Sequence, residues 1–118
     1  MALVLVVDDE PDIRLLARVV LTGAGHDVVE AVNGPSGLDR IGSEPPPDVV
    51  VLDLRMPGLD GWGVLAQLPD GSPPVVLVSA DPEANRREHR WVLSKPYRPA
   101  ELVAAVEAAL EDATSGRP

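Results

Sequence analysis

The chain has 118 residues, enough for one compact domain and too few for two. It is 45% hydrophobic but contains only three aromatic residues, so its core must be built from Val, Leu and Ala. A formal net charge of −9 and the absence of cysteine argue against nucleic-acid or anionic-membrane binding, disulfides and thiolate metal sites. No segment is long enough to span a bilayer and the N-terminus lacks a signal-peptide pattern, so we expect a cytoplasmic protein.

The first third of the chain predicts two strands, each followed by a helix. The apolar run at residues 3–7 is predicted to be a buried strand, and Pro11 suits the first position of the helix after it. Arg14 and Arg18 are expected on the polar side of that helix. Its apolar side is predicted to contain Ile13, Leu16, Ala17 and Val20. The next two elements are a strand at residues 27–32 and a weak helix at residues 35–41.

The middle third contains an apolar, mostly β-branched run, residues 48–53, that ends at a single carboxylate, Asp53. Such a run is typical of a buried strand in a parallel sheet. Open α/β sheets bind ligands at the carboxyl ends of their strands, so Asp53 stands where a functional group is expected. Taken alone, Asp53 suits an ordinary strand end equally well. Asp60 is predicted to cap a short helix at residues 61–68, and residues 75–79 form the fourth strand.

The last third predicts a short fifth strand at residues 91–94 and a final helix that begins at Pro99. Only 11 residues, 80–90, separate the fourth and fifth strands, and nearly all of them are polar. A helix without an apolar stripe has little to hold it against a sheet, so a short or missing helix is expected there. We expect one domain over residues 1–112, with residues 113–118 as a tail or the start of a linker.

The alternation of strands and helices predicts an α/β domain with a doubly wound, five-stranded parallel sheet. The expected strand order is 2-1-3-4-5, with helices on both faces. In that order the first and third strands are neighbours, which brings Asp8 and Asp9 to Asp53. Ser79 and Lys95, at the ends of the fourth and fifth strands, arrive on the other side of Asp53.

Three carboxylates in one crevice repel one another, so a positive group should offset them. Lys95 supplies one charge, and a site made only of oxygen ligands suits a hard cation such as Mg²⁺. A carboxylate beside Mg²⁺ and a lysine is a possible nucleophile toward phosphorus, with the Ser79 hydroxyl donating to a phosphoryl oxygen. Each residue alone suits an ordinary surface or helix-end role; their shared position at the strand ends favours a site.

Together these motifs resemble the receiver domain of response regulators, the CheY-like family with a flavodoxin-like fold. By position, Asp8 and Asp9 match the acidic pair and Asp53 the phosphorylated aspartate. Ser79-Ala80 matches the Ser/Thr-Ala pair, and Lys95-Pro96 the Lys-Pro pair with its cis peptide bond.

The resemblance implies Mg²⁺ bound by Asp9, Asp53 and the backbone carbonyl of Arg55, with Asp8 acting through water. It also implies a phosphoacceptor domain of a two-component phosphorelay, phosphorylated on Asp53 by a sensor histidine kinase or a phosphotransfer histidine. Such a domain switches an output partner, or a homodimer, through the surface of the fifth strand and its flanking helices. It is not a turnover enzyme: phosphatases and mutases that form an aspartyl phosphate need a second acid where Arg55 stands. No direct nucleic-acid or membrane partner is expected.

Two departures from the family pattern favour an alternative, a receiver-like interaction module that works without phosphorylation. Val92 occupies the position of the family's switch aromatic, while Trp91 is one residue away and should face the opposite side of the strand. The segment before Lys95 is also shorter than usual. Arg55 is further predicted to pair with Asp81 at the rim of the site. The two histidines, His26 and His89, are expected to be solvated and far from the motif.

Overall fold

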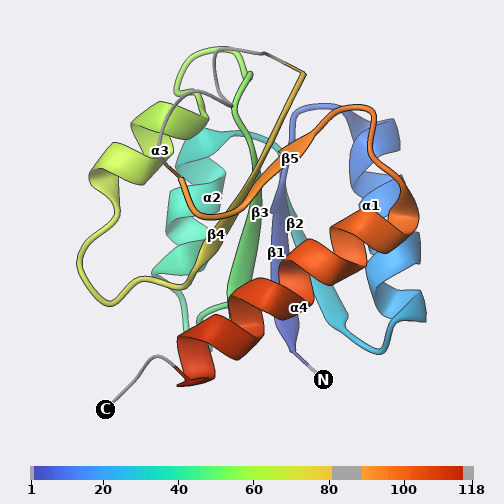
Figure 1. Ribbon diagram of the computed structural model, residues 1–118. Helices are drawn as coiled ribbons and strands as arrows, with labels where there is room; N and C mark the ends of the chain where they lie inside the picture. The colour runs from blue at the N-terminus through green and yellow to red at the C-terminus, as the bar shows by residue number, and fades with distance from the viewer. Residues whose placement is uncertain (1, 81–88, 116–118) are drawn as a thin grey trace.

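A computed structural model describes residues 2–80 and 89–115 of the chain (Figure 1). Strands and helices alternate along it as far as residue 79, as the hydrophobic pattern predicted. They are β1 (Leu3–Val7), α1 (Pro11–Gly23), β2 (Asp27–Ala31), α2 (Gly34–Ile41), β3 (Val49–Asp53), α3 (Gly61–Gln67), β4 (Val75–Ser79), β5 (Val92–Ser94) and α4 (Pro99–Ser115). Within the described residues, no helix is both long and apolar enough to cross a bilayer.

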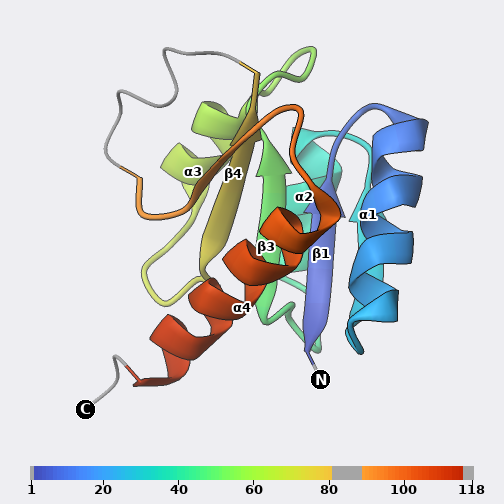
Figure 2. The same cartoon turned by 45° about the vertical axis from the view of Figure 1, so that its right-hand side comes forward.

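The five strands form one parallel sheet in the order β2-β1-β3-β4-β5, which confirms the predicted topology. Helices α1 and α4 cover one face of the sheet, and α2 and α3 cover the other (Figures 1 and 2). Because every strand runs in the same direction, the five carboxyl ends lie along one edge of the sheet.

The core consists of two aliphatic layers, one on each face of the sheet. In β1, Val4 and Val6 pack toward α1 and α4, whereas Leu5 and Val7 pack toward α2 and α3. Because both faces are covered, the two-residue alternation of a strand buries side chains on both sides, and in β3 and β4 every side chain is buried. Each fully buried Val or Leu stabilises the fold by about 1.5–3 kcal/mol.

Local signals in the sequence account for the helix starts. Pro11 lies in the first turn of α1, where a missing N–H costs nothing. Asn33 caps α2, because its side chain accepts a hydrogen bond of 2.8 Å from the Ser36 N–H. Asp60 caps α3 as predicted, accepting a hydrogen bond of 2.9 Å from the Gly63 N–H.

The predicted faces of α1 need correction. Leu16 is 47% exposed instead of buried, whereas the Arg14 side chain is only 14% exposed and points inward. The buried side of the helix follows the spacing i, i+3, i+7 through Arg14, Ala17 and Leu21. Both arginines were predicted on the polar side because they are charged. That prediction did not consider a charged partner inside the fold, and Arg14 forms an ion pair with Glu30 of β2.

Two predictions concern segments that are only partly described. Residues 81–88 lie outside the described part of the chain, so the short or missing helix between β4 and β5 stays a prediction, as does the pairing of Arg55 with Asp81. The described residues of this connection, 80 and 89–91, contain no helix. Helix α4 continues past residue 112 to Ser115, so the residues just beyond the predicted domain boundary are helical.

Candidate functional site

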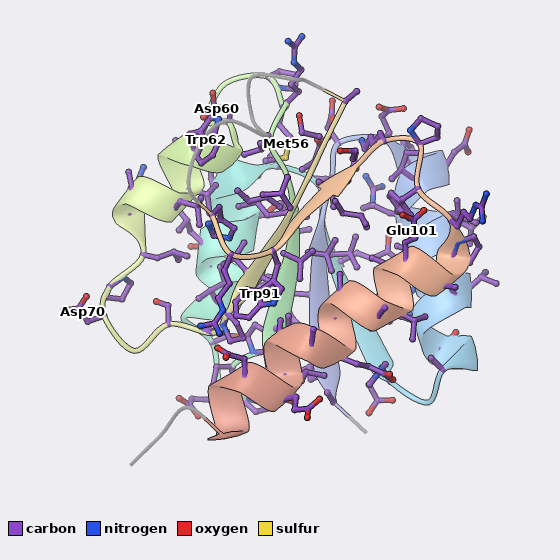
Figure 3. The ribbon with its side chains drawn as sticks, viewed as in Figure 1. Met56, Asp60, Trp62, Asp70, Trp91 and Glu101 are labelled. Atoms are coloured by element: carbon purple, nitrogen blue, oxygen red, sulfur yellow. The ribbon has the colours of Figure 1, made fainter. Side chains whose placement is uncertain are left out.

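The predicted site residues gather at the carboxyl edge of the sheet. Asp8 follows β1, Asp53 ends β3, Ser79 ends β4 and Lys95 follows β5. Met56 and Asp60, in the loop after β3, lie above the same edge (Figure 3). Because the sheet is parallel, four segments that are distant in sequence bring their side chains to the same edge of the sheet.

Asp8 is buried and held by several contacts. Its N–H donates to the carbonyl of Ala31 at 3.2 Å, and its Oδ1 accepts a hydrogen bond of 2.9 Å from the Glu10 N–H. Its Oδ2 lies 3.4 Å from Nζ of Lys95. The carboxylate is therefore fixed between the acidic loop that follows β1 and the lysine that follows β5.

Lys95 connects two carboxylates. Its Nζ lies 3.4 Å from Asp8 Oδ2 and 3.5 Å from Asp53 Oδ2. The other oxygen of Asp53, Oδ1, accepts a hydrogen bond of 3.2 Å from the Arg55 N–H. Both carboxylates are buried, so their interaction with the ammonium group is weakly screened by solvent.

Negative charge nevertheless exceeds positive charge in this crevice. Burial raises the pKa of Asp53 to about 6, and the neighbouring charge of Asp8 adds to the effect, while Lys95 opposes it. Burial alone would lower the pKa of Lys95, but the charges of Asp53 and Asp8 outweigh it and raise that pKa. The site therefore favours the binding of additional positive charge.

The acidic loop after β1 supplies further oxygen ligands. Carboxylate oxygens of Asp8, Asp9 and Glu10 all lie within 4.8 Å of one another, and Asp9 and Glu10 are exposed. An all-oxygen donor set of this kind suits a hard divalent cation. Glu10 was not among the predicted ligands. Its adjacency to the acidic pair is the sequence signal that would have included it.

Ser79 is buried at the end of β4, between the strands that carry Asp53 and Lys95. Its carbonyl accepts a hydrogen bond of 2.9 Å from the Lys95 N–H, and on the other side the Leu54 N–H donates to the carbonyl of Val78 at 3.0 Å. The next residue, Ala80, is small and exposed. The end of β4 thus lies between the strand that ends at Asp53 and the strand that precedes Lys95.

Arg14 also contacts the site, although it was not among the site residues predicted from the sequence. Its Nη1 donates a hydrogen bond of 2.8 Å to the carbonyl oxygen of Asp8. The helical spacing of Arg14 with Ala17 and Leu21, whose side chains are buried, was the sequence signal that could have identified it.

Trp91, next to β5, faces the side of the sheet that was predicted from the sequence. Trp91 packs against the layer of α1 and α4 (Figure 3), while Val92 packs against the layer of α2 and α3. The two residues therefore face opposite sides of the sheet. The Arg90 guanidinium lies 5.3 Å from the centre of the Trp91 ring and forms an ion pair of 2.6 Å with Asp112 of α4.

The two histidines were expected to be solvated, and this prediction is wrong. His26 is buried: its Nδ1 accepts a hydrogen bond of 3.3 Å from the Ala2 N–H, and its Nε2 lies 3.4 Å from Glu107 Oε2. His89 is partly buried, with Nε2 2.7 Å from the carbonyl oxygen of Val75. Local polarity suggested solvation, but the tertiary fold brings each ring to a backbone partner. Both contacts lie at the amino ends of strands, away from the acidic site.

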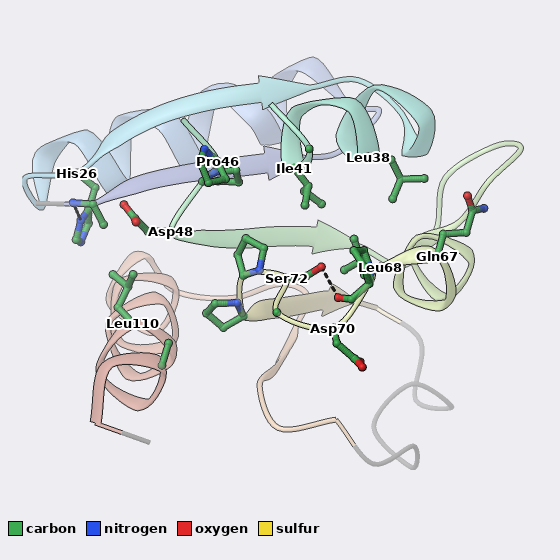
Figure 4. Close-up of a pocket in the computed structure, with 18 residues that line it drawn as sticks. His26, Leu38, Ile41, Pro46, Asp48, Gln67, Leu68, Asp70, Ser72 and Leu110 are labelled. Atoms are coloured by element: carbon green, nitrogen blue, oxygen red, sulfur yellow. Dashed lines mark hydrogen bonds between the residues drawn. The ribbon is translucent and has the colours of Figure 1, made fainter. Parts of the chain in front are cut away.

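Hollows in the surface do not by themselves identify the site. A hollow of about 1100 Å³ lies at the opposite, amino edge of the sheet, between the proline-rich loops that precede β3 and β4 (Figure 4). None of the predicted site residues lines it. A shallower one of about 440 Å³ is lined by residues of the loop that follows Asp53: Leu54, Arg55, Met56, Pro57 and Asp60.

Comparison with known proteins shows which family the chain resembles. Residues 4–107 match the family model of the response regulator receiver domain. The chain is 36% identical over 122 residues to the transcriptional regulatory protein KdpE of Mycobacterium tuberculosis, an alignment that covers 98% of this chain and 54% of the relative. It thus spans about half the length of the curated relatives it matches.

Solved structures show the same fold. A response regulator receiver domain protein from Clostridium thermocellum superposes with a TM-score of 0.87 at 24% identity, covering 99% of this chain and 100% of that one. The chemotaxis protein CheY4 of Vibrio cholerae superposes with a TM-score of 0.81 at 28% identity, covering 93% and 99% of the two chains. In both, the similarity extends over nearly the whole of the known protein.

The Lys95–Pro96 peptide bond of this chain is cis, as expected from the Lys-Pro motif.

Proposed function

The chain belongs to the response regulator receiver domain family, and from this premise we propose that Asp53 is its phosphoacceptor. The observation that carries the proposal is the bridge from Lys95 to Asp53 and Asp8 at the carboxyl edge of the sheet. Within a two-component system, the domain receives a phosphoryl group from a sensor histidine kinase or a phosphotransfer protein.

In the proposed reaction, one carboxylate oxygen of Asp53 attacks the phosphorus of a phosphohistidine. The new P–O bond forms as the P–N bond breaks, and the ring, already protonated on its other nitrogen, departs as neutral imidazole. Lys95 pairs with a phosphoryl oxygen, and the Ser79 hydroxyl donates a hydrogen bond to another. The Arg55 N–H orients Asp53 through Oδ1. These groups act mainly by positioning and by neutralising charge, which is what phosphoryl transfer requires.

A divalent cation fits the acidic residues of the site. We propose that Asp9, Asp53 and the backbone carbonyl of Arg55 hold Mg²⁺, with Asp8 acting through water. Two observations support this fit: the oxygen-only cluster of Asp8, Asp9 and Glu10, and the two buried carboxylates, Asp8 and Asp53, that share the single ammonium group of Lys95. When bound, Mg²⁺ supplies positive charge to the phosphoryl oxygens and to the carboxylates.

The output surface is part of the same proposal. We infer that phosphorylation changes how the face of β5 and α4 binds an output partner or a second copy of the chain, in the cytoplasm. The net charge of −9 makes a direct contact with nucleic acid unfavourable for this chain.

The proposal is tested by incubating the chain with a small-molecule phosphodonor and Mg²⁺ and measuring intact mass. The wild-type chain should gain one phosphoryl group, and the gain should disappear with Asp53→Asn or with a chelator. Asp70→Asn, an exposed change in the loop before β4, is the matched control and should label normally. A wild-type chain that gains no mass would instead favour the module that works without phosphorylation.

A further inference from the structure

We propose that Arg14 is a positioning residue for the cation site, because it fixes the peptide group from which Asp8 and Asp9 both project. This inference rests on the proposed function and adds to it a residue outside the motifs that define the site. It predicts that Arg14 sets the affinity for Mg²⁺ without touching the ion.

The contact is specific in its geometry. Nη1 of Arg14 donates a hydrogen bond of 2.8 Å to the carbonyl oxygen of Asp8. That carbonyl belongs to the peptide group that joins Asp8 to Asp9. The amide of Asp8 is held separately, by the carbonyl of Ala31 at 3.2 Å. Arg14 therefore restrains the plane whose rotation would swing the exposed carboxylate of Asp9 away from its neighbours.

Arg14 is itself held in place. Its Nε donates to Oε1 of Glu30 at 3.0 Å, and its side chain is only 14% exposed. Glu30 lies on β2, opposite Val6 of β1, so the anchor belongs to the sheet and not to the loop. The guanidinium thus joins a rigid strand to the acidic loop through two separate nitrogens, which a lysine ammonium cannot reproduce.

Arg18 offers a natural comparison. Its Nε donates to the other oxygen of Glu30, Oε2, at 2.6 Å, one turn further along α1. The two hydrogen bonds, that from Arg18 first, hold the pKa of Glu30 below its usual value. Arg14 and Arg18 share Glu30 as their carboxylate partner, and of the two it is Arg14 that also donates a hydrogen bond to Asp8. Any difference between them in cation binding therefore reports the contact with Asp8.

Charge and geometry have opposite effects here, and this makes the comparison decisive. Removing a cation near an acidic site should strengthen Mg²⁺ binding, since repulsion is lost. Loss of the positioning contact should weaken it, and outer-shell partners of metal ligands typically contribute about 10–100-fold in affinity. We expect the loss of positioning to dominate for Arg14, while for Arg18 only the weak charge effect remains.

The experiment measures the Kd for Mg²⁺ by titration calorimetry on the whole chain, with thermal unfolding of each variant recorded without the ion. Arg14→Met should weaken binding about tenfold. Arg18→Met should bind as tightly as the wild type or slightly more tightly. If Arg14→Met does not fold, Arg14→Lys and Arg18→Lys replace the pair, with the same expected difference.

Each result has a distinct meaning. An unchanged Kd for Arg14→Met, even with a lower Tm, would contradict the inference and leave Arg14 a structural residue. Equal weakening by both variants would also contradict it, because the effect would then act through Glu30. A wild-type chain that binds no Mg²⁺ would contradict the cation site of the proposed function, and the inference with it.

Discussion

The ammonium group of Lys95 lies 3.5 Å from the carboxylate of Asp53, although the strands that position these two residues are not neighbours. β4 separates β3 from β5, so the two backbones are about 9–10 Å apart at this edge. Only a long side chain can cross that distance, and Lys95 is the single lysine of the chain. The lysine side chain therefore spans the end of β4, the strand that ends at Ser79.

Replacing Lys95 should make Asp53 harder to ionise. Lys95→Met removes the nearest positive charge, so we expect the pKa of Asp53 to rise further above its value of about 6. The side-chain carboxyl signal of Asp53, followed by carbon NMR across pH, measures this directly. Arg98→Met, a loss of charge at an exposed position near the start of α4, is the control and should leave that pKa nearly unchanged. A pKa that falls or stays constant in Lys95→Met would show that the ammonium group does not stabilise the carboxylate.

Asp53 should cost the fold stability at neutral pH. Its pKa is about 6 in the folded chain against an ordinary value of 3.8, so between these values the folded state holds more protons than the unfolded state. The free energy of unfolding therefore falls as pH rises through this window. The penalty is absent below about pH 3.8 and fully present above about pH 6.

Asp53→Asn removes this penalty, so we expect it to stabilise the chain by about 1–3 kcal/mol at pH 7 and by far less near pH 4. Urea unfolding at the two pH values tests the difference, with Asp70→Asn as the exposed control. Stabilisation of equal size at both pH values would assign the effect to something other than ionisation.

Gly61 should be irreplaceable for steric reasons. A Cβ built there lies 2.8 Å from the carbonyl oxygen of Asp53 and 2.8 Å from Cα of Leu54, both backbone atoms. Gly61→Ala must therefore displace the backbone at the phosphoacceptor, and we expect a loss of about 1–3 kcal/mol in stability together with slower phosphorylation.

Gly23, at the end of α1, is the matched control, because a Cβ there meets nothing within 4 Å. Gly23→Ala should be neutral or stabilising by up to about 1 kcal/mol. Urea unfolding and a phosphorylation time course compare the two variants. Equal stability and equal labelling rates would mean that the loop after Asp53 accommodates the methyl group by moving freely.

Most of the fold could be predicted from the sequence because its signals are local. The run at residues 75–78 is uniformly apolar and ends at the polar Ser79, and the observed β4 has the predicted limits, Val75–Ser79. Strand order followed from the doubly wound pattern, and that order brought Asp8, Asp53 and Lys95 together before any distance was known. In a parallel sheet, residues at the carboxyl ends of adjacent strands lie close together even when they are distant in sequence.

What could not be predicted depends on long-range partners. Arg14 and His26 looked like polar surface residues, yet Arg14 is drawn inward by Glu30 and His26 is buried beside Ala2 and Glu107. The residue pattern within one helix or loop contains no information about a charged or polar partner that lies on another element. Leu16 was misplaced for the same reason: once Arg14 occupies the inner side of α1, the leucine two residues later turns toward solvent.

The most direct test locates the phosphoryl group on the chain. After incubation with a phosphodonor and Mg²⁺, borohydride reduces an aspartyl phosphate to homoserine, and peptide mass spectrometry then reads its position. We expect homoserine at position 53 alone, and none when Mg²⁺ is chelated or when Asp53 is replaced by asparagine. Homoserine at position 8 or 9, or its absence from a chain that has gained a phosphoryl group, would contradict the assignment of Asp53 as the phosphoacceptor.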